Sequence, residues 1–94
     1  MGRMPPRLRI HAPGAAAALL LRERLDGYGA TAESEPDGGW TVSVRLDAAP
    51  RETVPASFAI TRDWAEEFGL ASVPVDLDGH THLVRSSRPL AGVR

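Results

Sequence analysis

The sequence contains no cysteine, no lysine and neither of the two side-chain amides, and it is poor in aromatic residues. The absence of cysteine excludes disulfides, thiolate metal sites and thiol nucleophiles. All eleven basic residues are arginine. Because the chain uses arginine at every basic position, the presence of an arginine does not by itself indicate a phosphate-binding site. With only two Trp, two Phe and one Tyr, the core is expected to consist mainly of Val, Leu and Ala.

A strong net charge and long apolar runs are also missing. The formal net charge of −1 gives no electrostatic reason to bind nucleic acid. The longest apolar run, residues 14–21, is far too short to cross a bilayer, and no cleavable leader is evident. We therefore expect a cytoplasmic protein with no membrane partner. The length fits a single domain, 1–94, with frayed termini at 1–6 and 86–94.

The first half of the chain predicts a strand, a helix and a hairpin. Residues 7–12 alternate basic and apolar side chains, which is typical of a half-buried strand. Pro13 and Gly14 then open a helix that runs to residue 25 or 26. Segments 30–35 and 40–46 alternate around a Pro-Asp-Gly turn, which indicates a hairpin.

The second half predicts another helix and another hairpin. Residues 54–61 fit either a strand period or a helix period, and segment 55–60 stays open. We expect a helix over at least 61–68, capped by Thr61 and ended by Gly69. Strands at 73–77 and 80–85 then flank an Asp-Gly turn.

This order of elements predicts a two-layer α+β sandwich, in which two helices cover one face of a mostly antiparallel sheet. The order resembles the β-α-β-β-α-β layout of ferredoxin-like sandwiches, with an extra C-terminal hairpin strand. Because that architecture carries many unrelated functions, it implies no activity by itself.

The final hairpin holds the sharpest candidate for chemistry, a metal site formed by His80, His82 and Asp76. Alternate residues of a strand share a face, so the two imidazoles can chelate a divalent cation, with Asp76 or His11 as a further ligand. A two-residue turn would set His82 opposite Val75 and create a shielded pocket. A three-residue turn would set His82 opposite Asp76 and create an exposed pair.

The other polar features have plainer interpretations. A row formed by Arg7, Arg9, His11 and Arg45 could attract an acidic partner or phosphate, but it lacks the aromatic platforms of nucleic-acid readers. Glu33 and Glu35 are expected to neutralise this row by cross-strand pairing. No serine lies in a nucleophile elbow, so catalysis would need a borrowed cofactor or a site shared between subunits.

These observations favour a small, non-catalytic interaction or regulatory module that needs no cofactor. It would bind a protein partner or a second copy of itself as a homodimer. The residues expected to make the contacts are Leu20, Trp64 and Arg45, together with the edge of the last hairpin. Two alternatives stay open, a small-ligand or metal-binding domain that uses His80 and His82, and an enzyme subunit with an intersubunit site.

Overall fold

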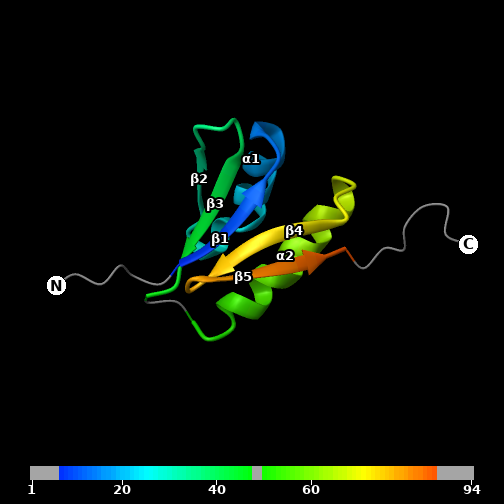
Figure 1. Ribbon diagram of the computed structural model, residues 1–94. Coiled ribbons are helices and arrows are strands. Elements are labelled where there is room, and N and C mark those ends of the chain that lie inside the picture. Colours follow the sequence, from blue (N-terminus) through cyan, green and yellow to red (C-terminus); the bar gives the residue numbers. More distant parts are fainter. Residues whose placement is uncertain (1–6, 48–49, 87–94) are drawn as a thin grey trace, which may run out of the picture.

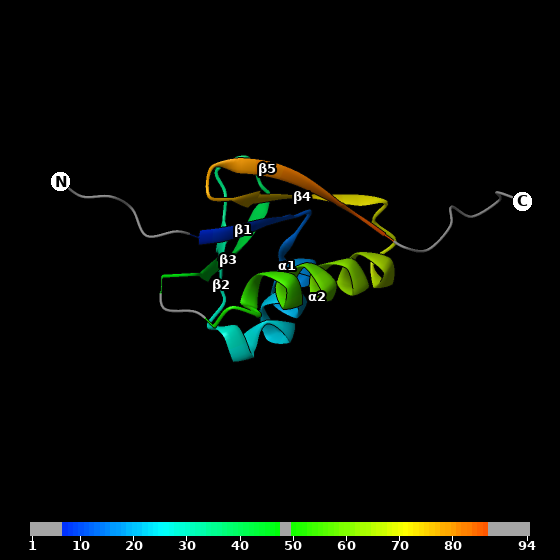
Figure 2. The same cartoon turned by 90° about the horizontal axis from the view of Figure 1, so that it is seen from below.

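The computed structural model describes residues 7–47 and 50–86. These residues form a five-stranded antiparallel sheet with two helices on one of its faces, which confirms the predicted α+β class (Figures 1 and 2). The elements are, in chain order, β1 (Arg7–Ala12), α1 (Ala15–Arg24), a 3-10 turn (Asp26–Tyr28), β2 (Thr31–Ser34), β3 (Trp40–Arg45), α2 (Thr53–Glu67), β4 (Ser72–Leu77) and β5 (His80–Arg85).

The strands are arranged in the order β2-β3-β1-β4-β5, so β2 and β5 are the two edges. This five-stranded order differs from the four-stranded ferredoxin-like order, and that finer expectation is therefore not confirmed. Of the predicted termini, 1–6 and 87–94 lie outside the described residues. Ser86 lies inside them, and its backbone N–H donates to the carbonyl of Ala71 at 3.0 Å.

Pairing between β1 and β4 is short, because it ends at Ile10 opposite Val75. Pro74, which precedes Val75 in β4, would pair next with β1, but proline has no N–H to donate to the neighbouring strand. Beyond that point the β4–β5 hairpin diverges from β1 (Figure 1).

The alternation along the strands gives the sheet two different faces. We call the face toward the helices the covered face, with Leu8, Ile10, Val42, Val44, Val73, Val75 and Val84 buried beneath α1 and α2. We call the opposite face the open face, with Arg7, Arg9, His11, Thr41, Ser43, Arg45, Asp76, Thr81, Leu83 and Arg85. The core combines the covered face with Ala17, Ala18 and Leu21 of α1, Leu25 directly after it, and Trp64 and Ala65 of α2. It consists mainly of Val, Leu and Ala, as predicted from the scarcity of aromatic residues.

Helix α2 is longer than predicted, since it begins at Thr53 and includes the whole segment left open at 55–60. Pro55 fits because it lies in the first turn, where its missing N–H would have no partner in the helix. Thr61 is not a cap but a buried residue in the middle of the helix. The predicted end at Gly69 is confirmed, with φ 70° and the N–H of Leu70 donating to the carbonyl of Ala65 at 2.8 Å.

Trp64 and Arg24 connect the two helices. The indole N–H of Trp64 donates to the backbone carbonyl of Ala17 at 2.9 Å, inside the core. At the surface, Arg24 donates to Glu67 at 2.7 Å, and this hydrogen bond holds the pKa of Glu67 below its usual value. Within the described part of the chain, neither helix has the length and apolar content needed to cross a bilayer.

Candidate interaction surface at the sheet edge

The turn between β4 and β5 determines which residues of the last hairpin share a face. Asp78 and Gly79 both have positive φ, 53° and 86°, the combination that defines a type I′ turn of two residues. The register follows, with Leu77 opposite His80 and Val75 opposite His82. Of the two registers considered from the sequence, the structure has the one with the shorter turn.

This register does not bring the three predicted metal ligands together. His80 and His82 lie on the side of Leu77 and Val75, whereas Asp76 lies opposite Thr81 on the open face. Both imidazoles are exposed, so the expected shielded pocket is not formed. The ring of Phe58 in α2 meets His82 edge-on, with centroids 6.2 Å apart. Among the residues described, no three His, Asp or Glu side chains are grouped to hold a metal ion.

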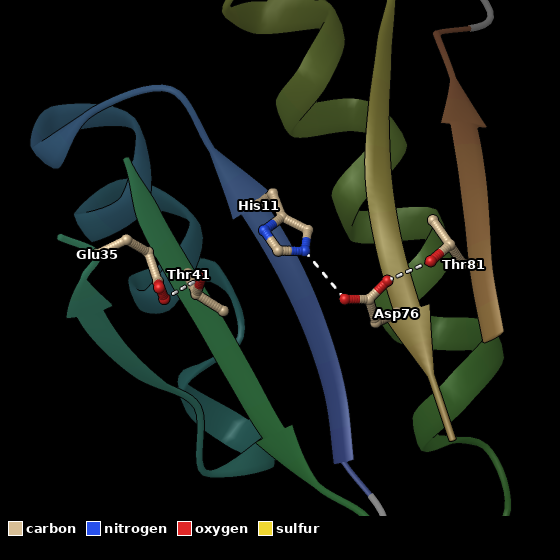
Figure 3. A network of polar contacts seen from close by, with 5 residues as sticks. All are labelled: His11, Glu35, Thr41, Asp76 and Thr81. Carbon is tan, nitrogen blue, oxygen red and sulfur yellow. Dashed lines mark hydrogen bonds and ion pairs between the residues drawn. The ribbon is translucent and has the colours of Figure 1, made fainter. Parts of the chain in front are cut away.

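Asp76 is instead the centre of a polar network that links β1, β4 and β5 (Figure 3). His11 donates from Nε2 to Oδ2 of Asp76 at 3.0 Å, and Thr81 donates from Oγ1 to Oδ1 at 2.7 Å. The hydrogen bond from Thr81, followed by the one from His11, lowers the pKa of Asp76 below its usual value. The carboxylate is therefore a fixed negative charge on the open face at neutral pH.

The network does not form a nucleophile–base pair. The hydroxyl of Thr81 and the imidazole of His11 bind different oxygens of the same carboxylate. A catalytic hydroxyl needs a base that accepts its proton, with the acid behind the base. Here the carboxylate stands between the two groups, so the arrangement orients side chains rather than activating one.

The basic row on the open face, Arg7, Arg9, His11 and Arg45, does not pair with the acidic residues expected from the sequence. Arg45 donates to Asp47, two residues along its own chain, at 2.9 Å, and this hydrogen bond lowers the pKa of Asp47. Glu35 accepts a hydrogen bond from Thr41 at 2.7 Å (Figure 3). Between the described residues, no ion pair joins an arginine of the row to Glu33 or Glu35, so the expected cross-strand pairs are not formed.

The three predicted contact residues differ in their exposure to solvent. Trp64 has no exposed surface, and its assignment to an interaction surface is wrong because the indole is enclosed in the core, where it hydrogen-bonds to Ala17 of α1. Leu20 is half-buried against the core, and Arg45 is exposed. The large apolar side chains that do reach solvent, among those described, are Leu83 at 57%, Leu19 at 48% and Phe68 at 39%.

The two edges of the sheet differ in length and in side chains. The edge strand β2 has four residues and includes Glu33, and short, charged edge strands discourage pairing with other chains. The edge strand β5 has six residues, contains neither proline nor an acidic residue, and has Leu83 near its middle. Leu83 is also the most exposed large apolar residue in the described structure. Among the described residues, the edge at β5 is therefore less protected than the edge at β2, with Arg85 as its charged side chain.

The register also shows which backbone groups of β5 face outward. His80 faces Leu77 across the two-residue turn, so its N–H points into the hairpin, and in an antiparallel ladder this direction alternates along the strand. The N–H and C=O groups of Thr81, Leu83 and Arg85 consequently point away from β4. The sequence pattern alone does not show which backbone groups of β5 point outward, because this depends on the register of the β4–β5 hairpin.

No family model, curated protein or solved structure matches the chain.

Proposed function

We propose that the protein is a small, non-catalytic, cytoplasmic interaction module that binds a protein partner by strand addition at the outer edge of β5. The observation that carries the proposal is the six-residue edge strand β5, in which Leu83, near the middle, is 57% exposed. Neither nucleic acid, a membrane nor a cofactor has a part in the proposed interaction.

Strand addition would use both the backbone and the side chains of β5. The outward backbone groups of Thr81, Leu83 and Arg85 would supply affinity through main-chain hydrogen bonds. Alternate side chains would supply selectivity, with Leu83 offering an apolar contact on the open face and His82 meeting the partner on the other side. Arg85, two residues beyond Leu83, gives this edge a positive charge, which favours a partner with an acidic side chain within reach of the guanidinium.

We further propose that the inner strands and both helices follow a ferredoxin-like plan to which β5 has been added. In support, β1 lies between β3 and β4 with antiparallel pairing on both sides, and β5 extends the sheet beyond β4. An added edge strand suits an interaction role because the remainder of the core needs only Val84 from it.

Photo-crosslinking in the cells that naturally produce the protein tests the proposal. A benzophenone side chain at position 83 is expected to form protein adducts, and the same group at position 19 serves as the matched control. Both positions hold an exposed leucine, but Leu19 lies on α1. Thr81→Pro, which removes one outward N–H from an edge strand, should abolish the adducts at position 83. Equal labelling at both positions, or none at position 83, would contradict the proposal.

A second candidate function is metal binding by His80 and His82. The observation in its favour is the register, which puts both exposed imidazoles on one side of β5. Calorimetry with zinc or nickel should then show heat with the natural protein and none with His82→Ala. An absence of heat with the natural protein rules this function out.

A further inference from the structure

We propose that the partner at β5 is a second copy of this chain, paired antiparallel about a two-fold axis at Leu83. The pairing rests on the proposed role of β5 as an interaction edge and would join the two sheets into one. Symmetric pairing of identical patches is the commonest way in which soluble proteins form dimers.

The outward backbone groups select this register. Thr81, Leu83 and Arg85 are spaced evenly about Leu83, so an axis at this residue sets Leu83 opposite its own copy and Thr81 opposite Arg85. Every outward N–H and C=O of β5 then has a partner. A shift by two residues in one direction sets Arg85 opposite Gly79 in the turn, and a shift in the other direction sets Thr81 beyond the end of β5.

The side chains agree with the same register. The two copies of Leu83 meet on the open face, which removes the most exposed large apolar side chain of the described structure from water. On the opposite side, His82 faces Val84 of the second copy. Like charges do not oppose each other, because Arg85 faces the neutral Thr81.

The charges across the interface are complementary. Thr81 lies between Asp76 on one side and Arg85 of the second copy on the other. Two strand spacings, about 10 Å between Cα atoms, separate Asp76 from this arginine, and a long guanidinium side chain reaching over the short threonine closes most of that gap. Asp76 is ionised, since Thr81 and His11 hydrogen-bond its carboxylate. The two-fold axis makes this contact twice.

Single-cysteine variants test the register directly, because the natural sequence has no cysteine. Leu83→Cys brings two thiols together on residues whose Cα atoms are about 5.5 Å apart, which suits a disulfide. Thr81→Cys is the matched control on the same strand and face. Its two copies are separated by four residues along the strand, about 13 Å, so it should not cross-link with itself.

Mild oxidation is expected to cross-link Leu83→Cys at least ten times faster than Thr81→Cys or Arg85→Cys alone. A mixture of Thr81→Cys and Arg85→Cys should form a mixed dimer, since these positions oppose each other. Equal rates for Leu83→Cys and Thr81→Cys, or no cross-link at position 83, would overturn the proposed pairing.

Sedimentation equilibrium provides an independent measurement on the unmodified chain. The natural protein should show a concentration-dependent monomer–dimer equilibrium, which Leu83→Pro abolishes and Leu19→Lys leaves unchanged. If Leu83→Pro fails to fold, Thr81→Pro removes a different outward N–H and should have the same effect. A natural protein that stays monomeric at every concentration overturns self-pairing. An adduct between position 83 and a different protein would then still support the proposed interaction module, so the two failures are distinguishable.

Discussion

The covered face and the open face of the sheet are made by alternate residues of the same strands, yet they are held together by different forces. The covered face buries aliphatic side chains under two helices, and Trp64 is buried with them. The open face is organised by solvent-accessible hydrogen bonds, of which the His11–Asp76–Thr81 network spans three strands. Burial outweighs exposed polar pairs in free energy, so stability is expected to depend on the covered face. Recognition is left to the open face and to the edge at β5.

Trp64→Ala should produce the largest effect and tests whether the covered face carries the stability. Removing a fully buried indole is expected to lower the free energy of unfolding by about 3–5 kcal/mol, measured by urea denaturation. Trp64→Phe keeps most of the volume but leaves the carbonyl of Ala17 without the indole donor, so a smaller loss of about 1–2 kcal/mol is expected. A loss below about 1 kcal/mol for Trp64→Ala would contradict this assignment.

Thr61→Val should stabilise the protein, because the side of α2 that packs on the covered face contains buried hydroxyls without a hydrogen bond to any described residue. Thr53, Ser57 and Thr61 lie four residues apart on the buried side of α2, and their hydroxyl oxygens have no hydrogen-bond partner among the described residues. Valine has nearly the same shape as threonine, so a gain of about 1 kcal/mol is expected in urea denaturation.

Thr41→Val is the matched control for that gain. Thr41 is also buried, but its hydroxyl donates to Glu35, so the same substitution should cost about 0.5–1.5 kcal/mol. If both variants shift stability in the same direction, the hydroxyl partner is not the deciding factor.

Thr81→Val tests the electrostatics of the open face through Asp76. Because the folded protein lowers the pKa of this carboxyl, Asp76 stabilises the fold at pH values above its ordinary pKa. That contribution is lost as the pH falls through the lowered value of the folded state. Removing the hydroxyl should raise the pKa of Asp76 in an NMR titration and reduce stability slightly at neutral pH. Thr81→Ser retains the donor and is expected to leave the pKa in place.

Arg45→Ala should produce the smallest effect. Its hydrogen bond to Asp47 is exposed, and water replaces exposed ion pairs at little cost. We expect an unchanged midpoint of urea denaturation and a rise in the pKa of Asp47 toward its ordinary value. A clear shift of the midpoint would show that the open face carries more stability than the comparison of the two faces implies.

Local patterns in the sequence predicted much of the fold. The alternation in residues 7–12, the Asp78-Gly79 turn and the end of α2 at Gly69 each depend on neighbouring residues, and all three are present in the structure. The prediction that Thr61 caps a helix was wrong, because threonine occurs both at helix caps and at buried positions within helices. The sequence does not distinguish the two.

The site was less predictable, because its residues come together through strand neighbours that are distant in sequence. His11 and Asp76 are 65 positions apart, and they meet because β1 and β4 are adjacent. Trp64 shows the same limit, since helical spacing placed it on an apolar stripe but did not indicate whether the stripe faces the core. The close approach of Ala17 decides that it does.

The sequence by itself determined the order of the elements, the mainly aliphatic core and the place of the last turn at Asp78-Gly79, because these follow from side-chain periodicity and backbone conformations within a few residues. Only the tertiary structure decided that Trp64 is enclosed, that Asp76 faces away from His82, and that β5 is a sheet edge with Leu83 in water. The physical reason is that burial and strand neighbours depend on how distant segments pack, and a local pattern is compatible with more than one such packing.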